Sequence, residues 1–211
     1  MTAPPKLLIF AGSTRRNSLN GRLAQAAADL ALASGAEVTL LELADLAIPM
    51  YQGDLETEGM PADVMRLKQI LFAHSGWIIC SPEYNGSYPA LLKNTIDWAT
   101  RPVKSDPAWA DGLKPFSGKV VGVLSASPGA LGGLRAQSHL VPLLIALQCW
   151  VAPKAFALSR AAEAFDADGG LIQDAHRQSV RGVIDQVLFA AGRLAPTPGA
   201  AETASRTQFS K

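Results

Sequence analysis

The residues of this chain best suited to binding a ligand lie in three polar, glycine-containing stretches. These are residues 12–20 (GSTRRNSLN), 81–89 (SPEYNGSYP) and 125–133 (SASPGALGG). Each follows a short apolar run that is typical of a buried strand. Hydroxyl, guanidinium and backbone N–H donors dominate these stretches, which suits the holding of an anionic ligand.

The first stretch predicts a site for a phosphate monoester. Gly12 allows a tight exit from a strand, and Ser13, Arg15, Ser18 and Asn20 gather donors into one turn. A helix that starts here adds unpaired N–H groups and a partial positive charge. Alternatively, Ser18 is only a helix N-cap and the arginines are solvated.

Two common nucleotide-binding motifs are missing from this region. No Gly-Lys-Ser/Thr follows Gly12 at the spacing of a nucleoside-triphosphate loop, and no Gly-x-Gly-x-x-Gly fingerprint is present. A mononucleotide is therefore favoured over a dinucleotide as the ligand of this cleft.

The second stretch favours a flat heterocycle beside a tight turn. Pro82 fixes one backbone angle, Asn85 and Gly86 tolerate positive φ, and Tyr84 supplies an aromatic face. An ordinary turn would explain Pro, Asn and Gly, but not why Glu83 and Tyr84 stand directly after a strand.

The third stretch adds a weaker signal. Gly129, Gly132 and Gly133 would let the backbone approach a ligand closely, although glycine-rich turns are common in any protein. Ser127 is the side chain expected nearest to a bound ring.

Apolar runs and amphipathic segments alternate along the chain. The expected strands are residues 6–11, 37–43, 77–80, 119–124 and 150–157. The expected helices are residues 19–33, 62–73, 90–100, 134–147 and 176–194. Strands that are apolar throughout and separated by helices indicate a parallel α/β sheet covered on both faces. Such sheets bind ligands beyond the carboxyl ends of their strands, where the three stretches lie.

Composition narrows the function classes. The 211 residues, 48% of them hydrophobic, suit one domain, and a net charge of +1 argues against a nucleic-acid binder. We find no apolar stretch long enough for a membrane span and no signal pattern at the start, and we expect a cytoplasmic protein. Cys80 and Cys149 stand in apolar runs and are interpreted as buried small hydrophobic residues. The three histidines lack ligand spacing, so no metal site is expected.

Together the three motifs resemble the NADPH-dependent FMN reductase family. The resemblance rests on GSTRRNSLN, on SPEYNGSYPALLKNTIDW and on SPGALGGLRA, and it extends over roughly residues 6–194. It implies a flavodoxin-like three-layer sandwich whose five-stranded parallel sheet has helices on both faces, with a reductase domain at residues 1–195. Residues 196–211 are expected to form a disordered polar tail.

The resemblance also implies a cofactor and a site. FMN would be bound non-covalently, with NADPH or NADH as the electron donor and a quinone, flavin, azo compound or chromate as the acceptor. Flavin electronics carry the chemistry, so no catalytic side chain is expected. The implied FMN contacts are Ser13, Arg15, Ser18, Leu19 and Asn20 for the phosphate, Pro82, Glu83, Tyr84, Asn85 and Gly86 for the ribityl chain and ring, and Ser127 and Gly129 on the other side of the ring.

Several alternatives stay open. Arg101 is a candidate for binding the NADPH phosphate or an anionic acceptor, or it is a cation at a helix C-terminus. A flavodoxin-type electron carrier would bind the same FMN but is normally strongly acidic, and a redox-sensing interaction protein would bind it without turnover. Family resemblance suggests a homodimer or homotetramer. The acceptor, the preferred nicotinamide and the role of the loop at residues 104–117 stay open.

Overall fold

A computed structural model describes residues 5–194 of this chain, which contain a parallel sheet in the order β2-β1-β3-β4-β5, with β6 also paired to β4. The strands are β1 (Lys6–Ala11), β2 (Glu37–Leu41), β3 (Gly76–Cys80), β4 (Val120–Ala126), β5 (Trp150–Val151) and β6 (Phe156–Leu158). The helices are α1 (Leu19–Ala33), α2 (Gly53–Glu58), α3 (Ala62–Ala73), α4 (Ala90–Ala99), α5 (Leu134–Ala146) and α6 (Asp174–Leu194). Short 3-10 turns lie at Leu43–Asp45, Pro107–Trp109 and Ala161–Glu163.

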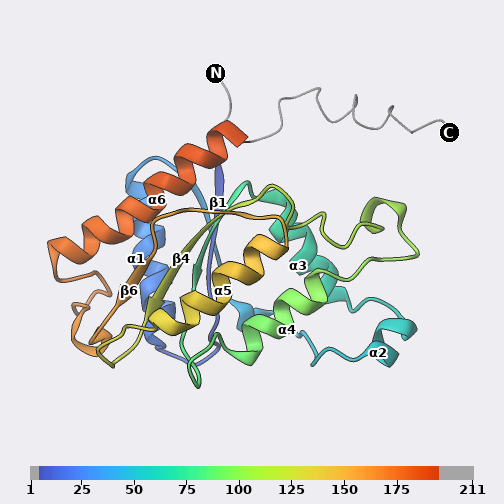
Figure 1. Ribbon diagram of the computed structural model, residues 1–211, viewed down its shortest axis with the longest axis horizontal. Helices are drawn as coiled ribbons and strands as arrows, with labels where there is room; N and C mark the ends of the chain where they lie inside the picture. The colour runs from blue at the N-terminus through green and yellow to red at the C-terminus, as the bar shows by residue number, and fades with distance from the viewer. Residues whose placement is uncertain (1–4, 195–211) are drawn as a thin grey trace.

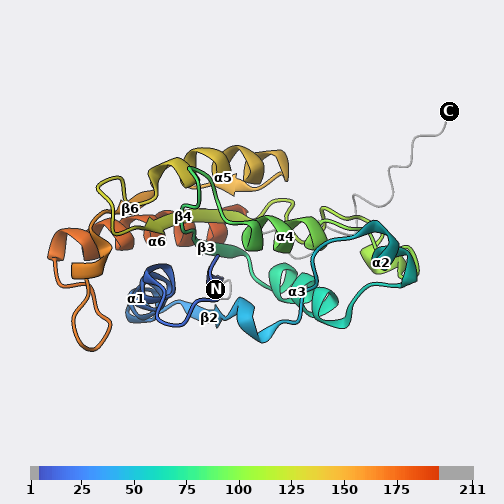
Figure 2. The same ribbon diagram turned by 90° about the horizontal axis from the view of Figure 1, so that it is seen from below.

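Two apolar cores sandwich the sheet, as expected for a flavodoxin-like fold. One core packs α1 and α6 against one face, and the other packs α3, α4 and α5 against the opposite face. Figure 2 shows α1 and α6 on one side of the strands and α3 and α4 on the other. The strands β1, β3 and β4 are buried along nearly their whole length because both of their faces are covered. The predicted three-layer α/β class is confirmed.

The fifth strand differs from its prediction. Residues 150–157 were expected to form one strand, but β5 and β6 are separate and pair with opposite ends of β4. Pro153 lies between them and has no N–H for a ladder hydrogen bond, so it interrupts the pairing. The N–H of Lys154 instead donates to the Gln186 side chain at 2.8 Å.

Other differences are small or lie outside the described chain. The helix α2 was not predicted, and β2 ends two residues before its predicted end. Cys80 and Cys149 are free and buried, as expected, and burial raises the pKa of the Cys80 thiol. The predicted tail at 196–211 is outside the described residues, and the domain limit at residue 195 stays a prediction. No helix within 5–194 has the length and apolar character that crossing a membrane requires.

The sheet order brings the three polar loops to one place. The chain leaves β1 toward β2 on one side and later crosses to β3 on the other, which makes the β1/β3 boundary the switch point of the sheet. Figure 1, in which the chain enters β1 at the top, shows the loops that follow β1, β3 and β4 along the lower edge of the sheet. A ligand site is therefore expected at this edge.

Candidate functional site

A cleft of about 120 Å³ lies at this switch point. Its lining consists of Ser13, Arg15, Ser18, Leu19, Asn20, Pro82, Glu83, Tyr84, Ala126, Ser127 and Pro128. Most of the predicted ligand-binding residues thus meet in one cleft. Asn85, Gly86 and Gly129 belong to the same loops but not to its lining, whereas Ala126 and Pro128 line it and were missed by the sequence analysis.

The start of α1 leaves donors for a ligand. Ser18 is the N-cap, and its hydroxyl oxygen accepts from the Gly21 N–H at 2.8 Å, while its own N–H donates to the Arg15 carbonyl. Of the four N–H groups that a helix start leaves without intrahelical partners, those of Leu19 and Asn20 remain. Ser18 is thus both the cap of the alternative interpretation and part of the cleft.

The side chain of Asn20 acts inside the protein. It is only 3% exposed, its Nδ2 donates to the Ala126 carbonyl at 2.9 Å, and its Oδ1 accepts from the Ala126 N–H at 2.9 Å. This pair of hydrogen bonds joins the start of α1 to the end of β4. The sequence analysis assigned the amide to a ligand, whereas here it fixes the distance between two walls of the cleft.

The second loop forms a two-residue turn. The N–H of Tyr84 donates to the Ser87 carbonyl at 2.9 Å, and the N–H of Ser87 donates back to the Tyr84 carbonyl at 3.0 Å. Asn85 and Gly86 have φ of 52° and 80°, the positive values that a type I′ turn requires at both central residues. The predicted tolerance of positive φ is confirmed, and Tyr84 stands 55% exposed on this turn.

Helix α5 holds both ends of this turn. The Glu83 carboxylate accepts from the Arg135 guanidinium at 2.7 Å and from the Arg135 backbone N–H at 3.1 Å. One helical turn further along, His139 Nδ1 lies 3.0 Å from the Ser87 hydroxyl. The sequence analysis missed both α5 residues, although Arg135 stands inside the third quoted motif and His139 follows at i+4 spacing. Glu83 therefore acts as a positioning residue whose charge is balanced by Arg135.

The glycines of the third loop serve the protein's own packing. A Cβ on Gly132 would lie 2.7 Å from the backbone of Ala157, and a Cβ on Gly133 would lie 2.9 Å from Ser125 Cβ; both residues have positive φ. A Cβ on Gly129 would meet only the Ser127 hydroxyl, at an ordinary 3.5 Å. Packing within the protein is therefore a sufficient reason for glycine at positions 132 and 133, and the expected close approach of this loop to a ligand stays a prediction.

Arg101 lies in a different cavity, with residues 56–60 and 102–105. Its Nε lies 3.0 Å from both carboxylate oxygens of Glu56, and this hydrogen bond holds the pKa of Arg101 above its ordinary value. The buried Lys68 ammonium donates to the Ala99 and Arg101 carbonyls at 2.7 Å, and burial lowers the pKa of Lys68 to about 8. The hydrogen bonds of Lys68 thus hold in place the C-terminal end of α4 and the residues that follow it, including Arg101.

The cleft has the donor set that a phosphorylated flat cofactor needs. The N–H groups of Leu19 and Asn20, the Ser13 hydroxyl and the Arg15 guanidinium belong to residues that line the cleft, and they suit a phosphate. The turn after Glu83 provides backbone and an exposed aromatic ring. A cleft of this volume accommodates the phosphate end, so a ring system would lie along the rim beside Tyr84. The residues present therefore fit FMN.

Comparison with known proteins agrees with this chemistry. The family model described as NADPH-dependent FMN reductase matches residues 5–163. An NAD(P)H-dependent FMN reductase of Pseudomonas aeruginosa is 37% identical over 178 residues, covering 83% of this chain and 89% of that protein. A quinone reductase of Escherichia coli strain K12 is 34% identical over 187 residues, covering 88% of both chains.

A solved structure of a flavoenzyme also resembles this chain. The flavoenzyme NAD(P)H:(acceptor) oxidoreductase FerB of Paracoccus denitrificans superposes with a TM-score of 0.73 at 31% identity, covering 90% of this chain and 98% of that one. The family model spans well over half of the chain, and both sequence relatives match along most of their lengths. This chain belongs to the NADPH-dependent FMN reductase family.

Proposed function

We propose that this protein binds one FMN in the switch-point cleft and passes electrons from NADPH or NADH to a small acceptor of the quinone type. The observation that carries the proposal is that the start of α1 and the residues leading into the Asn85-Gly86 turn line one cleft, within a chain of this family. The names of the relatives, FMN reductase and quinone reductase, support the same donor and acceptor classes.

The protein's part in this reaction is positioning and electrostatics. FMN, when bound, supplies the hydride-accepting and electron-donating chemistry. The start of α1, with Ser13 and Arg15, would hold the phosphate, and Ser127 and Gly129 would bound the ring opposite the turn. The N–H groups of Asn85 and Gly86 would donate toward the ring and favour negative charge on it. The salt bridge between Glu83 and Arg135 keeps that turn in place.

The exposure of the turn fits a reaction with diffusing substrates. Tyr84 is more than half exposed, so one face of a ring bound beside it would remain open. A nicotinamide and a flat acceptor would use that face in turn. Arg101 remains our candidate for an anionic group of an acceptor or donor, provided that this group displaces Glu56.

Anaerobic titration of the purified protein tests the proposal. The holoprotein should show a flavin absorption spectrum that bleaches with NADPH or NADH and recovers when a quinone is added. Steady-state oxidation of the nicotinamide with a quinone separates a reductase from an electron carrier or a redox sensor, both of which turn over slowly without a protein partner. A colourless protein that takes up no FMN at micromolar concentration would overturn the assignment.

Assembly and location are further parts of the proposal. We infer a cytoplasmic homodimer or homotetramer. The association is inferred because large apolar side chains stand exposed on and beside α5, among them Leu134, Ile145 and Trp150. Exposed apolar side chains gathered on one element are typical of association surfaces. Light scattering on the eluting holoprotein measures the mass, and a monomer at micromolar concentration contradicts the inference.

A further inference from the structure

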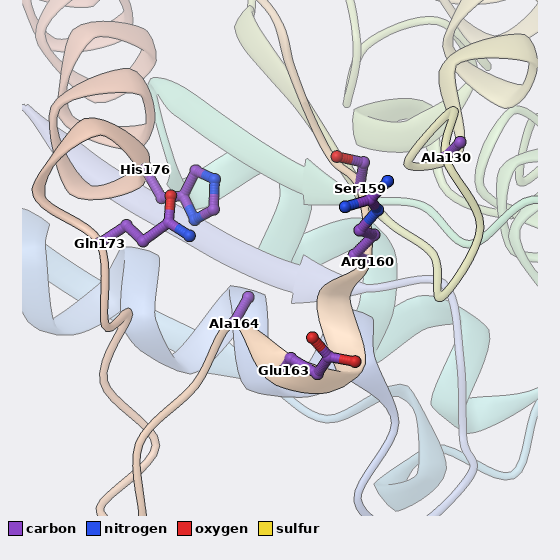
Figure 3. A pocket seen from close by; sticks show the side chains of 7 residues that line it. All are labelled: Ala130, Ser159, Arg160, Glu163, Ala164, Gln173 and His176. Carbon is purple, nitrogen blue, oxygen red and sulfur yellow. The ribbon is translucent and has the colours of Figure 1, made fainter.

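A second cleft lies on the other side of the loop that follows β4. It has a volume of about 420 Å³ and is lined by Ala130, Ser159, Arg160, Glu163, Ala164, Gln173 and His176. Figure 3 shows Ser159 and Arg160 on one wall, His176 and Gln173 on the opposite wall, and Glu163 below Arg160. The walls come from the segment after β6 and from the start of α6.

The polar side chains of this cleft have unpaired hydrogen-bonding groups. Within residues 5–194, the side chains of Ser159, Arg160, Glu163, Gln173 and His176 take part in no hydrogen bond or ion pair with one another or with other described residues. His176 Nδ1 is buried and has no hydrogen-bond partner. Arg160, Glu163 and Gln173 are exposed to solvent, whereas buried polar atoms are normally paired, so the unpaired His176 Nδ1 beside this cavity is the observation that points to a ligand.

The backbone at Arg160 is held in an unusual conformation. Its φ of 47° and ψ of 39° are left-handed, which is strained for a residue other than glycine, asparagine or aspartate. The N–H of Arg160 donates to the Gly129 carbonyl at 3.2 Å, and the N–H of Ala161 donates to the Ser127 carbonyl at 3.0 Å. Strain of this kind accumulates at ligand sites, and these two backbone hydrogen bonds fix the main chain at Arg160 to the loop that also borders the FMN cleft.

The side chains that line the second cleft favour a nucleoside phosphate as its ligand. The guanidinium and the hydroxyl suit a phosphate, because arginine pairs with phosphate through two parallel N–H groups. Glu163 and Gln173 offer acceptors for ribose hydroxyls or an adenine amino group, which inorganic phosphate lacks. A volume of about 420 Å³ lies within the range of small-ligand sites.

The position of the cleft identifies which nucleoside phosphate. Ser127 and Pro128 line the FMN cleft, and Ala130 of the same loop lines the second cleft. The two clefts are thus separated by a few residues of chain, roughly 11 Å when extended. A nicotinamide dinucleotide joins its ring to an adenosine through a pyrophosphate, so its two halves fit neighbouring sites. We propose that the second cleft binds the adenosine end of NADPH, with Arg160 on the 2′-phosphate.

This inference rests on the proposed function, because it assumes a nicotinamide donor. Its direct test is calorimetric titration of the holoprotein with 2′,5′-ADP and with 5′-AMP, which differ by the 2′-phosphate. Arg160→Asn removes the guanidinium and keeps a residue that tolerates left-handed backbone. Arg66→Gln, an exposed arginine on α3 away from the cleft, is the control for the loss of one positive charge.

The expected results are specific to the 2′-phosphate. Wild type and Arg66→Gln should bind 2′,5′-ADP more tightly than 5′-AMP, and Arg160→Asn should weaken 2′,5′-ADP binding about 10-fold while 5′-AMP binding changes less than about 2-fold. Arg160→Gly, which also tolerates the backbone conformation, should give the same loss. The ratio of KM for NADPH to KM for NADH should rise about 10-fold in both Arg160 variants.

The outcomes separate this inference from the proposed function. If wild type binds the two nucleotides equally or binds neither at millimolar concentration, the second cleft is not the adenosine site. The same conclusion follows if Arg160→Asn behaves like Arg66→Gln. A protein that oxidises neither nicotinamide, by contrast, overturns the proposed function itself.

Discussion

The two clefts beside the β4–α5 loop are built in opposite ways. In the FMN cleft the side chains of Ser18, Asn20 and Glu83 bond to the protein itself, and the groups left for a ligand include backbone N–H groups. In the second cleft, only the backbone groups of Arg160 and Glu163 have described hydrogen-bond partners, and the two side chains are unpaired. The first arrangement gives a site that is rigid before the ligand arrives, whereas the unpaired side chains of the second can reorient toward a ligand that comes and goes.

This difference matches the roles of the two ligands. A resident cofactor gains affinity from groups that lose little freedom on binding, because ordering of side chains opposes association. A donor that must leave after each turnover is served by a looser site. Of the four predictions below, the first three test the rigid side of this contrast and the last tests Arg101, which lies in a different cavity; they begin with the largest expected effect.

Asn20→Ala should have the largest effect. It removes the two hydrogen bonds that join α1 to β4 and leaves the backbone polar groups of Ala126 buried and unpaired. The free energy of unfolding should fall by about 3 kcal/mol, and the purified protein should lose most of its FMN. Urea unfolding and the flavin absorbance per protein measure both. Asn17→Gly, at an exposed position with positive φ, is the control and should change neither.

Glu83→Gln should come next. The carboxylate is only 9% exposed and receives two N–H groups of Arg135, so removal of its charge weakens the fixation of the turn. FMN should bind about 10-fold more weakly, since hydrogen bonds to charged groups contribute about 1.5–3 kcal/mol. Fluorescence titration of apoprotein with FMN gives the affinity. Arg135→Lys keeps the charge and the backbone N–H and should lose less; equal losses in the two variants would contradict the positioning role.

Asn85→Ala should have a moderate effect, and Asn85→Gly should reverse it. Alanine at a φ of 52° costs about 1–2 kcal/mol, whereas glycine adopts this conformation freely. FMN affinity should therefore fall several-fold in the alanine variant and return in the glycine variant. If glycine fails to restore it, the Asn85 side chain contacts the cofactor directly, and the backbone account of this turn is wrong.

Arg101→Gln should have the smallest effect. Because its guanidinium already pairs with Glu56, an anionic acceptor must compete with that carboxylate. We expect KM for a sulfonated naphthoquinone to rise about 2-fold and KM for the neutral quinone to stay the same, as partly exposed ion pairs are weak. Glu56→Gln, which releases Arg101, should lower KM for the sulfonated acceptor. If KM for the sulfonated acceptor is unchanged in both variants, Arg101 does not bind the anionic group of an acceptor.

The sequence predicted the strands and helices better than the hydrogen bonds that join distant parts of the chain. The apolar runs and helical periodicity predict most of the strands and helices because each depends on neighbouring residues, although α2 was missed and the strand expected at 150–157 is two strands. The hydrogen bonds from Asn20 to Ala126 and from Glu83 to Arg135 join residues 106 and 52 positions apart, and no local sequence pattern predicts them. For the same reason, the sequence predicted which loops form the FMN cleft but not which side chains are already bonded.

The second cleft was hidden for a related reason. Its polar residues are spread over residues 159–176 without a motif, and single polar residues in such segments are ordinary surface residues. Only the fold shows that they surround one cavity and have no other described side-chain partners. Pro153 was a readable signal, since proline rarely lies within a strand, and it could have predicted the division between β5 and β6.

That division has a consequence for how the molecule behaves at high concentration. A long, straight border strand offers a row of unpaired backbone groups onto which a neighbour's strand can add, the first step toward fibrous aggregates. Here the border beside β4 consists of two pieces of two and three residues, separated by four residues that include Pro153 and Lys154. The sheet therefore presents no continuous template on that side, and ordered intermolecular stacking through it is disfavoured.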